Sequence, residues 1–234
     1  MPELIALIPL PAGISYIKNM NRRIIYTVVA VIALVIIGFT IWNHERGTST
    51  PTIPMTTETG DSVEVTPTNQ LRVRTAEAAP VIDLAAWRLE VSGLVEQTVS
   101  FNFDEIQQLP TVERQVDLHC VEGWTDTGLW KGVRLQDVLD RAGLTEGAET
   151  VVFSSPGGYT TSLTVADIDQ TDPLLVYGVN GDRLPDNQGF PLRLVVPDRY
   201  GYKWIKWVTG IEVIQGEYKG YWESRGYSND AKIK

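Results

Sequence analysis

The sequence contains one cysteine, Cys120, and two histidines among its 234 residues. A single cysteine excludes an internal disulfide, and these three residues cannot supply the four ligands of a structural zinc site. The Cys-x-x-Cys-His pattern that attaches haem covalently is also absent from the sequence. Disulfide scaffolds, Cys/His zinc domains and covalently bound haem are therefore excluded for this chain.

An excess of positive charge is missing as well, since the formal net charge is −9 and the pI is near 4.8. Binding to a phosphate backbone requires a basic face, so the charge argues against nucleic acid as a partner. The acidic residues are spread along the chain, which favours a role in solubility. Beyond the N-terminal segment, the length suits about one domain that folds without disulfides.

An uncharged run extends from Ile24 to Trp42, close to the ~20 residues that a helix needs to cross a membrane. Lys18, Arg22 and Arg23 precede this run, and a weaker positive cluster at 44–46 follows it. The positive-inside rule then places residues 1–23 in the cytoplasm and the later residues outside, in the periplasm. The sequence predicts a single-pass cell-membrane anchor, with a buried core helix as the alternative.

Other sequence features indicate whether this N-terminal segment is cleaved and how it connects to the globular domain. No A-x-A-like cleavage site follows the apolar run, which favours an uncleaved anchor over a removed signal peptide. Arg22-Arg23 resembles a degenerate twin-arginine export signal, and Met20 is an alternative start. Residues 43–70 are rich in Thr, Pro and Ser from Gly47 onward, and they predict an extended linker to a globular domain at 71–234.

The globular part alternates between short strands and shorter helices. Asn102 precedes a predicted helix at 103–109, Gly143 follows another at 134–142, and Asn180-Gly181 is typical of a hairpin turn. Strands outnumber helices without a regular βαβ period, so we predict an α+β fold with mixed or antiparallel sheets. The predicted strands span 87–95, 113–119, 150–154, 174–179, 192–196 and 204–214.

Cys120 lies where a predicted strand enters a loop. A lone cysteine is usually a small buried residue, but its thiolate can also attack a substrate or ligate a soft metal. His119 is adjacent, yet neighbours along a strand point to opposite faces, so His119 is poorly placed as a base for Cys120. A cysteine hydrolase is therefore disfavoured, and metal ligation remains open where a cofactor supplies the other ligands.

Cations and aromatic residues interleave between residues 188 and 207. Arg193, Lys203 and Lys206 stand among Tyr200, Tyr202, Trp204 and Trp207 in an otherwise acidic chain. Arginine and lysine bind phosphate by charge and by directed donors, so the pattern predicts an anion site. A half-buried pair of strands with solvated cations is the alternative.

Three blocks of sequence, in order, resemble the molybdopterin-binding domain of the sulfite oxidase superfamily. They read HCVEGWTDTGLWKGVRLQDVLDRAGL, DPLLVYGVNGDRLPDNQGFPLRLVVPDRYGYKWIKWVTGIEV and YWESRGYSND, within a similarity that covers about residues 71–229. The resemblance is closest to the small bacterial and archaeal members, which include the catalytic subunit of periplasmic methionine sulfoxide reductase. It implies the fold of that domain and a molybdenum–molybdopterin cofactor.

The resemblance also implies roles for individual residues. Cys120 matches the cysteine that ligates molybdenum, and Arg193 matches an arginine that contacts the pterin. Tyr227 matches the tyrosine that faces the metal, and Glu122 matches an acid beside the site. The remaining implied cofactor contacts are Arg74, Thr75, Ser155, Gln188, Trp204, Ile205 and Lys206. Arg74 also faces the metal pocket in this comparison.

Two departures from the superfamily bear on the reaction. Sulfite oxidases carry an arginine for the sulfite anion five residues after the cysteine, where this chain has Thr125. The sequence also shows no haem site of its own. The resemblance thus implies two-electron oxygen-atom transfer, with reduction of an S-oxide or N-oxide such as protein methionine sulfoxide preferred. A sulfite dehydrogenase is the alternative enzyme, and a cofactor-free binding module on the same fold is the alternative of another class.

Electrons must then come from another protein. A membrane haem protein or a quinone-linked protein is the expected partner, because the predicted anchor holds the domain at the membrane. The expected substrate is a small-molecule or protein-bound oxide outside the cytoplasm. A twin-arginine signal agrees with this expectation, since that route exports proteins already loaded with cofactor.

Overall fold

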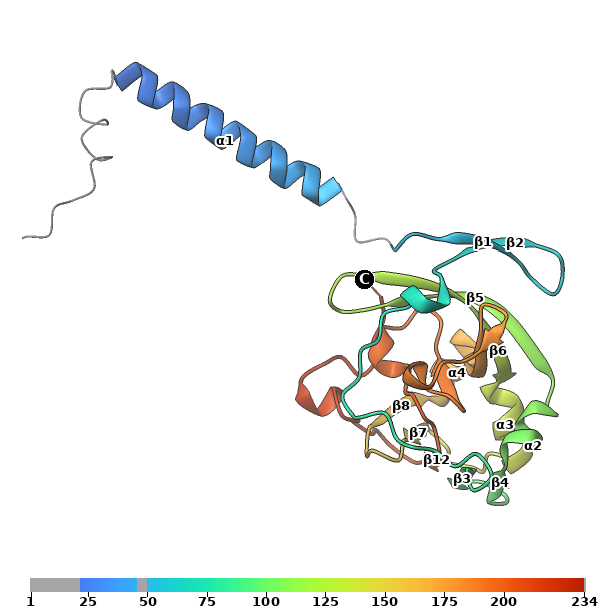
Figure 1. The fold of residues 1–234 in the computed structure, drawn as a ribbon. Coiled ribbons are helices and arrows are strands. Elements are labelled where there is room, and N and C mark those ends of the chain that lie inside the picture. The colour runs from blue at the N-terminus through green and yellow to red at the C-terminus, as the bar shows by residue number, and fades with distance from the viewer. Residues whose placement is uncertain (1–21, 46–49, 234) are drawn as a thin grey trace, which may run out of the picture. The chain divides into compact units, whose positions relative to one another are not determined.

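A computed structural model describes residues 22–45 and 50–233, which fall into two compact units (Figure 1). The first unit contributes one helix, α1 (Arg22–Glu45), so the apolar run is helical as predicted. Among the residues described, no helix meets the length and hydropathy of a membrane span. The predicted tail before residue 22, including Lys18 and Met20, lies outside the described residues.

The second unit begins with a hairpin of β1 (Ile53–Thr56) and β2 (Ser62–Val65), which pair antiparallel. The prediction of an extended linker is wrong for this part of residues 43–70. Val65 and Thr66 are buried, and the Thr66 amide donates to the Thr127 carbonyl at 2.7 Å. Val63 and Val65 alternate along β2, and β-branched residues of this kind favour strand pairing, which composition alone did not reveal.

Two five-stranded sheets form the body of the domain. One has the order β10-β9-β6-β5, with β11 also paired to β9, and the other has the order β4-β3-β12-β7-β8. All pairs are antiparallel except β12 with β3. The first sheet consists of β5 (Thr111–His119), β6 (Thr125–Arg134), β9 (Leu174–Val179), β10 (Asp182–Arg183) and β11 (Arg193–Val195). The second consists of β3 (Leu89–Gly93), β4 (Val99–Phe101), β7 (Thr150–Ser154), β8 (Thr160–Thr164) and β12 (Gly210–Ile214).

Short helices connect these strands, and their ends follow local sequence signals. Asn102 caps α2 (Phe103–Gln107), because its side chain accepts from the Glu105 amide in a capping box. Gly143 ends α3 (Leu135–Ala142) with φ of 70°. The remaining helices are α4 (Val165–Thr171) and the 3-10 turns η2 (Thr68–Gln70), η3 (Asp186–Gln188), η4 (Gly201–Lys203) and η5 (Glu223–Arg225). The predicted α+β class with mixed sheets is confirmed.

One continuous cluster of buried apolar side chains joins the two sheets. All six residues of β9 are buried, because this strand has neighbours on both edges and packing on both faces. A rigid core of this kind fixes the strand ends, and the loops at those ends carry the candidate site.

One predicted strand is only partly present. Of residues 204–214, the structure makes β12 from Gly210 to Ile214, while the preceding residues run beside β11 without a regular ladder. The Leu194 amide donates to the Ile205 carbonyl at 2.9 Å, and Trp207 adopts φ of 54°. The stretch 204–207 is therefore a bent, buried segment rather than a strand, and all four of its residues line a cavity.

Candidate active site

A cavity of about 310 Å³ opens where four segments of the chain meet. The segments are residues 72–77, the β5–β6 turn at 118–124, the stretch 201–207 and the C-terminal turn at 222–227. Tyr159 and Arg193 complete the wall. The cavity brings together nine of the residues predicted for the site, namely Arg74, Thr75, Cys120, Glu122, Arg193, Trp204, Ile205, Lys206 and Tyr227.

Cys120 occupies the tip of the β5–β6 hairpin. Its amide donates to the Trp124 carbonyl at 2.9 Å, and the Gly123 amide donates to the Cys120 carbonyl at 3.0 Å, which closes a tight turn. The free thiol is half-buried, and burial raises its pKa above the ordinary value. A thiol of this kind is a weak nucleophile unless a metal cation displaces its proton.

His119 is not placed to act as a base for Cys120. Its Nδ1 lies 2.9 Å from the Thr125 hydroxyl, and its ring lines a different surface groove from the cavity that Cys120 lines. The alternation of side chains along β5 explains this separation. The expectation that His119 is no base for Cys120 agrees with the geometry, and the position of Thr125 lies outside the cavity wall.

Two cations form the inner wall. Arg193 is 3% exposed and Lys206 is 7% exposed, and neither has an ion-pair partner within the described parts of the chain. Burial lowers the pKa of Arg193 to about 9. Burial, together with the charge of Arg193, lowers the pKa of Lys206 to about 7. Two buried cations without an ion-pair partner favour binding of an anion, although the charge of Glu77 partly offsets that of Lys206.

Neighbouring groups orient these cations while leaving donors free. The Gln188 side-chain oxygen accepts from Arg193 Nη1 at 2.6 Å, and Lys206 Nζ donates to the Asn187 carbonyl at 2.9 Å. Arg193 Nε is buried and has no acceptor among the described residues. Its guanidinium also lies 5.2 Å from the centre of the Trp130 ring. The unsatisfied donor and the two cations fit the phosphate of a pterin cofactor.

At the cavity mouth, positive and negative charges are matched. Arg74 Nε donates to Glu122 Oε2 at 2.8 Å, and Trp124 Nε1 donates to the same oxygen at 3.0 Å. These hydrogen bonds from Trp124 and Arg74 hold the pKa of the Glu122 carboxyl below its usual value. The guanidinium of Arg72 lies 4.7 Å from the centre of the Trp124 ring and pairs with the buried Asp126.

The C-terminal turn at 222–227 carries two aromatic rings of the wall. Tyr227 is 37% exposed, and its ring centroid lies 5.0 Å from that of Trp222 and 5.2 Å from that of Tyr202. The Tyr227 amide donates to the Trp222 carbonyl at 3.2 Å. The turn therefore places Tyr227 in the wall of the cavity that Cys120 also lines.

Two of the predicted cofactor contacts do not line the cavity. Gln188 stands behind Arg193, and Ser155 donates to Glu77 Oε2 at 2.8 Å. Each supports a charged residue of the wall rather than facing the cavity itself. Thr75 does line the cavity, but its hydroxyl donates to the Glu77 carbonyl at 2.7 Å.

Several wall residues were not predicted from the sequence. Glu77 lies in an alanine-rich loop without a motif, and Tyr159 follows a Gly-Gly turn. The Tyr159 hydroxyl donates to the Tyr202 carbonyl at 2.5 Å, and burial raises the pKa of Tyr159 far above its usual value. The other unpredicted wall residues are Arg72, Ala76, Leu118, Val121, Trp124, Gly201, Tyr202, Trp207 and Trp222. Of these, Val121 and Trp124 lie in the Cys120 block, Gly201, Tyr202 and Trp207 lie in the block of cations and aromatics, and Trp222 adjoins the Tyr227 motif. The sequence therefore indicated these segments without assigning a role to these individual residues.

Comparison with known proteins agrees with this geometry. Residues 76–222 match the family described as "Oxidoreductase molybdopterin binding domain". The "Uncharacterized oxidoreductase YuiH" of Bacillus subtilis is 38% identical over 62% of this chain and 74% of that protein. The "Putative protein-methionine-sulfoxide reductase subunit YedZ1" of Azospira oryzae is 36% identical over 63% of this chain and 56% of that protein.

A third relative and a solved structure complete the comparison. The "Protein-methionine-sulfoxide reductase catalytic subunit MsrP" of Xanthomonas campestris is 35% identical over 60% of this chain. The match spans about half of MsrP, at 48% of its length. The crystal structure of the sulfane dehydrogenase SoxCD from Paracoccus pantotrophus shares the fold, with a TM-score of 0.57 and 22% identity over 70% of this chain and 51% of that chain.

The family match covers more than half of the chain and includes most of the cavity wall. Cys120, Arg193 and Lys206 are the kinds of residue that such a cofactor needs for its metal and its phosphate. The chain is therefore an enzyme of the molybdopterin-binding oxidoreductases of the sulfite oxidase superfamily, with molybdenum–molybdopterin as its cofactor.

Proposed function

We propose that this enzyme reduces an S-oxide or N-oxide, with protein-bound methionine sulfoxide as the preferred substrate. The reaction takes two electrons and two protons, breaks the S–O bond, and releases a thioether and water. When bound, the molybdenum cofactor would supply the two-electron redox chemistry. The similarity to YedZ1 and MsrP, which are named for the reduction of protein methionine sulfoxide, supports this choice of substrate.

The inner wall would hold the cofactor. Cys120 would give its thiolate to the metal, since soft sulfur suits molybdenum and metal binding overcomes the raised pKa of the thiol. Arg193 and Lys206 would hold the anionic phosphate, which in turn would restore the charge of Lys206. Trp204 and Ile205 would exclude water from the same wall, because both are 2% exposed.

Residues at the mouth would handle the substrate. The hydroxyl of Tyr227 can donate a hydrogen bond to a substrate oxygen near Cys120, and Arg74 can stabilise charge that develops on that oxygen. Glu122 would keep Arg74 in place through the 2.8 Å contact. Hydrogen-bond donors of this kind act most strongly where the site excludes water.

The pairing of Arg74 with Glu122 is the observation that carries the choice of a neutral substrate. Sulfite is an anion, and its binding would require a cation at the mouth that no acid already neutralises. Thr125, where sulfite oxidases have arginine, contacts His119 away from the cavity. A sulfite dehydrogenase is therefore the second candidate, and a cofactor-free binding module is inconsistent with the family and its cofactor.

The electron source and the location are further parts of the proposal. A haem-containing or quinone-linked membrane protein would reduce the enzyme, and α1 would anchor the chain with its N-terminus in the cytoplasm. The uncharged run at 24–42 and the arginines before it support this orientation. Fractionation of cells, followed by carbonate extraction of the membranes, tests the anchor independently of the reaction.

Metal analysis and substrate assays test the proposed reaction. Protein from a host that makes the cofactor should contain about one molybdenum per chain, as one cofactor site requires. With a reduced viologen dye as electron donor, methionine sulfoxide should oxidise the dye, and Cys120→Ala should lack both the metal and the activity. Rapid oxidation of sulfite together with no reduction of sulfoxides would show that the sulfite dehydrogenase alternative is right.

A further inference from the structure

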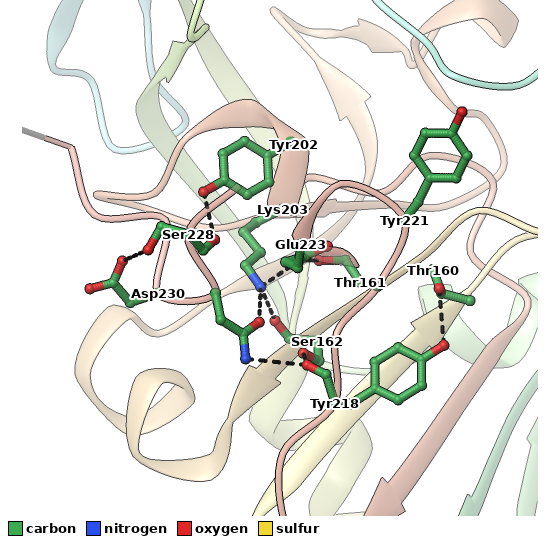
Figure 2. A network of polar contacts seen from close by, with 12 residues as sticks. Thr160, Thr161, Ser162, Tyr202, Lys203, Tyr218, Tyr221, Glu223, Ser228 and Asp230 are labelled. Atoms are coloured by element: carbon green, nitrogen blue, oxygen red, sulfur yellow. Dashed lines mark hydrogen bonds and ion pairs between the residues drawn. The ribbon is translucent and has the colours of Figure 1, made fainter. Parts of the chain in front are cut away.

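A fully buried ion pair lies beside the cavity without lining it. Lys203 Nζ and Glu223 Oε1 are 2.6 Å apart, and both side chains are 0% exposed (Figure 2). Lys203 ends η4, and Glu223 begins η5 near the C-terminus. The pair therefore joins two segments that have no regular ladder between them.

Further hydrogen bonds surround this pair, while the second carboxylate oxygen, Glu223 Oε2, is buried and has no hydrogen-bond partner among the described residues. Lys203 Nζ also donates to the Ser162 carbonyl at 2.8 Å and to Asn229 Oδ1 at 3.2 Å. Its three ammonium hydrogens thus have three acceptors. Glu223 Oε1 accepts a second hydrogen bond, from the Thr161 hydroxyl at 2.6 Å. Thr161 and Ser162 belong to β8, so the pair is attached to a strand of the core sheet.

Cavity residues are adjacent in sequence to both members of the pair. Tyr202 precedes Lys203, and Trp222 precedes Glu223. Tyr227 lies at the end of the same C-terminal turn, where its ring contacts those of Tyr202 and Trp222. A displacement of Glu223 would therefore shift the aromatic side of the cavity mouth.

We propose that Lys203 and Glu223 are positioning residues that hold Tyr227 and Trp222 in the wall of the cavity that Cys120 lines. The proposal rests on the proposed function for the part that Tyr227 plays toward the substrate. Outside the buried pair, the turn is solvent-exposed from Ser224 to Ser228. Because a buried ion pair contributes little net stability compared with apolar packing, its benefit here is a fixed geometry.

A protease assay tests, without any substrate, whether the buried pair holds the C-terminal turn to the rest of the domain. Trypsin can cut after Arg225, which is exposed on the turn. In the cofactor-loaded full chain, Glu223→Gln should speed this cut at least about tenfold, because local opening becomes easier. The control is Asp172→Asn, which removes the partly exposed acid that pairs with Arg114 (2.6 Å) and Arg134 (3.8 Å) away from the cavity and should leave the cut unchanged. The fragment that starts at Gly226 identifies the site by mass.

Double-mutant kinetics test whether the pair acts through Tyr227. Glu223→Gln and Tyr227→Phe should each lower kcat/KM for methionine sulfoxide, and the double variant should be no slower than the worse single variant, because both remove one function. Molybdenum content should stay at the wild-type level in all three. If Glu223→Gln does not fold, Thr161→Val removes one hydrogen bond of the pair and should give a smaller increase in cleavage.

Either of two results would overturn the proposal, namely an unchanged rate of cleavage after Arg225 or losses of kcat/KM that multiply in the double variant. Failure of the proposed function looks different. In that case, the protein holds molybdenum and fails to reduce sulfoxides, whereas Glu223→Gln still speeds cleavage after Arg225.

Discussion

Lys206 should destabilise the protein in the absence of cofactor, and its replacement should therefore stabilise it. The pKa of Lys206 falls from 10.5 to about 7, chiefly through burial. At 1.36 kcal/mol per pKa unit, this corresponds to about 5 kcal/mol lost on folding at acid pH. Lys206→Met also removes the hydrogen bond to the Asn187 carbonyl, which costs about 2 kcal/mol. The net gain in unfolding free energy should be about 3 kcal/mol at pH 6.

The sign of the pH dependence follows from proton counts. Between pH 7 and 10.5, the unfolded state holds a proton on Lys206 that the folded state lacks, so wild-type stability rises with pH. The advantage of Lys206→Met is therefore complete below pH 7 and shrinks by about 3 kcal/mol by pH 9. In a host that makes the cofactor, the same variant should lose bound molybdopterin.

Urea unfolding at pH 6 and pH 9 measures the effect on protein from a host that cannot make molybdopterin. Lys131→Met is the control, because Lys131 is 36% exposed and its hydrogen bond to Glu58 raises its pKa. That variant should show no gain at either pH. If Lys206→Met lowered the unfolding free energy equally at both pH values, burial would not disfavour the charged amine, and the anion site would lose its main support.

Three further predictions concern the metal, the support of Arg193 and the mouth. Cys120→Ser should abolish molybdenum binding in metal analysis and change the unfolding free energy by less than about 1 kcal/mol, since the thiol is half-buried. Gln188→Met removes the 2.6 Å contact to Arg193 and should cost about 1–3 kcal/mol in urea unfolding, with reduced cofactor content. Glu122→Gln frees Arg74, so sulfate should become an inhibitor at neutral pH. In the wild type, sulfate should inhibit only below the usual range of a glutamate, because the lowered pKa of Glu122 keeps Arg74 paired. Equal inhibition of both proteins at neutral pH would contradict this.

Much of the fold was predictable because its signals are local. The capping box at Asn102, the left-handed Gly143 and the Asn180-Gly181 turn each act within a few residues. By contrast, β6 was not predicted, although it pairs with both β5 and β9. Its Gly132 breaks the pattern of strand residues, yet any side chain there would collide with the backbone of β9 at Leu175.

The site was predictable where one motif faces the cavity and unpredictable where distant segments supply the wall. The block at Cys120 and the bent segment at Trp204–Lys206 both line the cavity as the resemblance implied. Sequence position alone does not distinguish a residue that lines the cavity from one that only contacts a lining residue. For this reason Ser155 and Gln188 were predicted as cofactor contacts, although neither lines the cavity. Glu77 and Tyr159 meet at the cavity only through the tertiary fold, since the Tyr159 amide donates to Glu77 Oε2 at 3.2 Å.

The cations of the inner wall have no ion-pair partner among the described residues, whereas the cation Arg74 at the mouth is paired with an acid. This difference bears on both the proposed cofactor contacts and the proposed substrate. Arg193 and Lys206 are buried in the inner wall without acids to pair with them in the described structure, so an anion gains most there. The outer cation Arg74 already has its acid. An anionic substrate would have to break that pair or compete with the phosphate for the inner cations, whereas a neutral S-oxide does neither. In the proposed assignment, the inner cations would retain the cofactor, and the pairing of Arg74 with Glu122 would favour a neutral sulfoxide over sulfite.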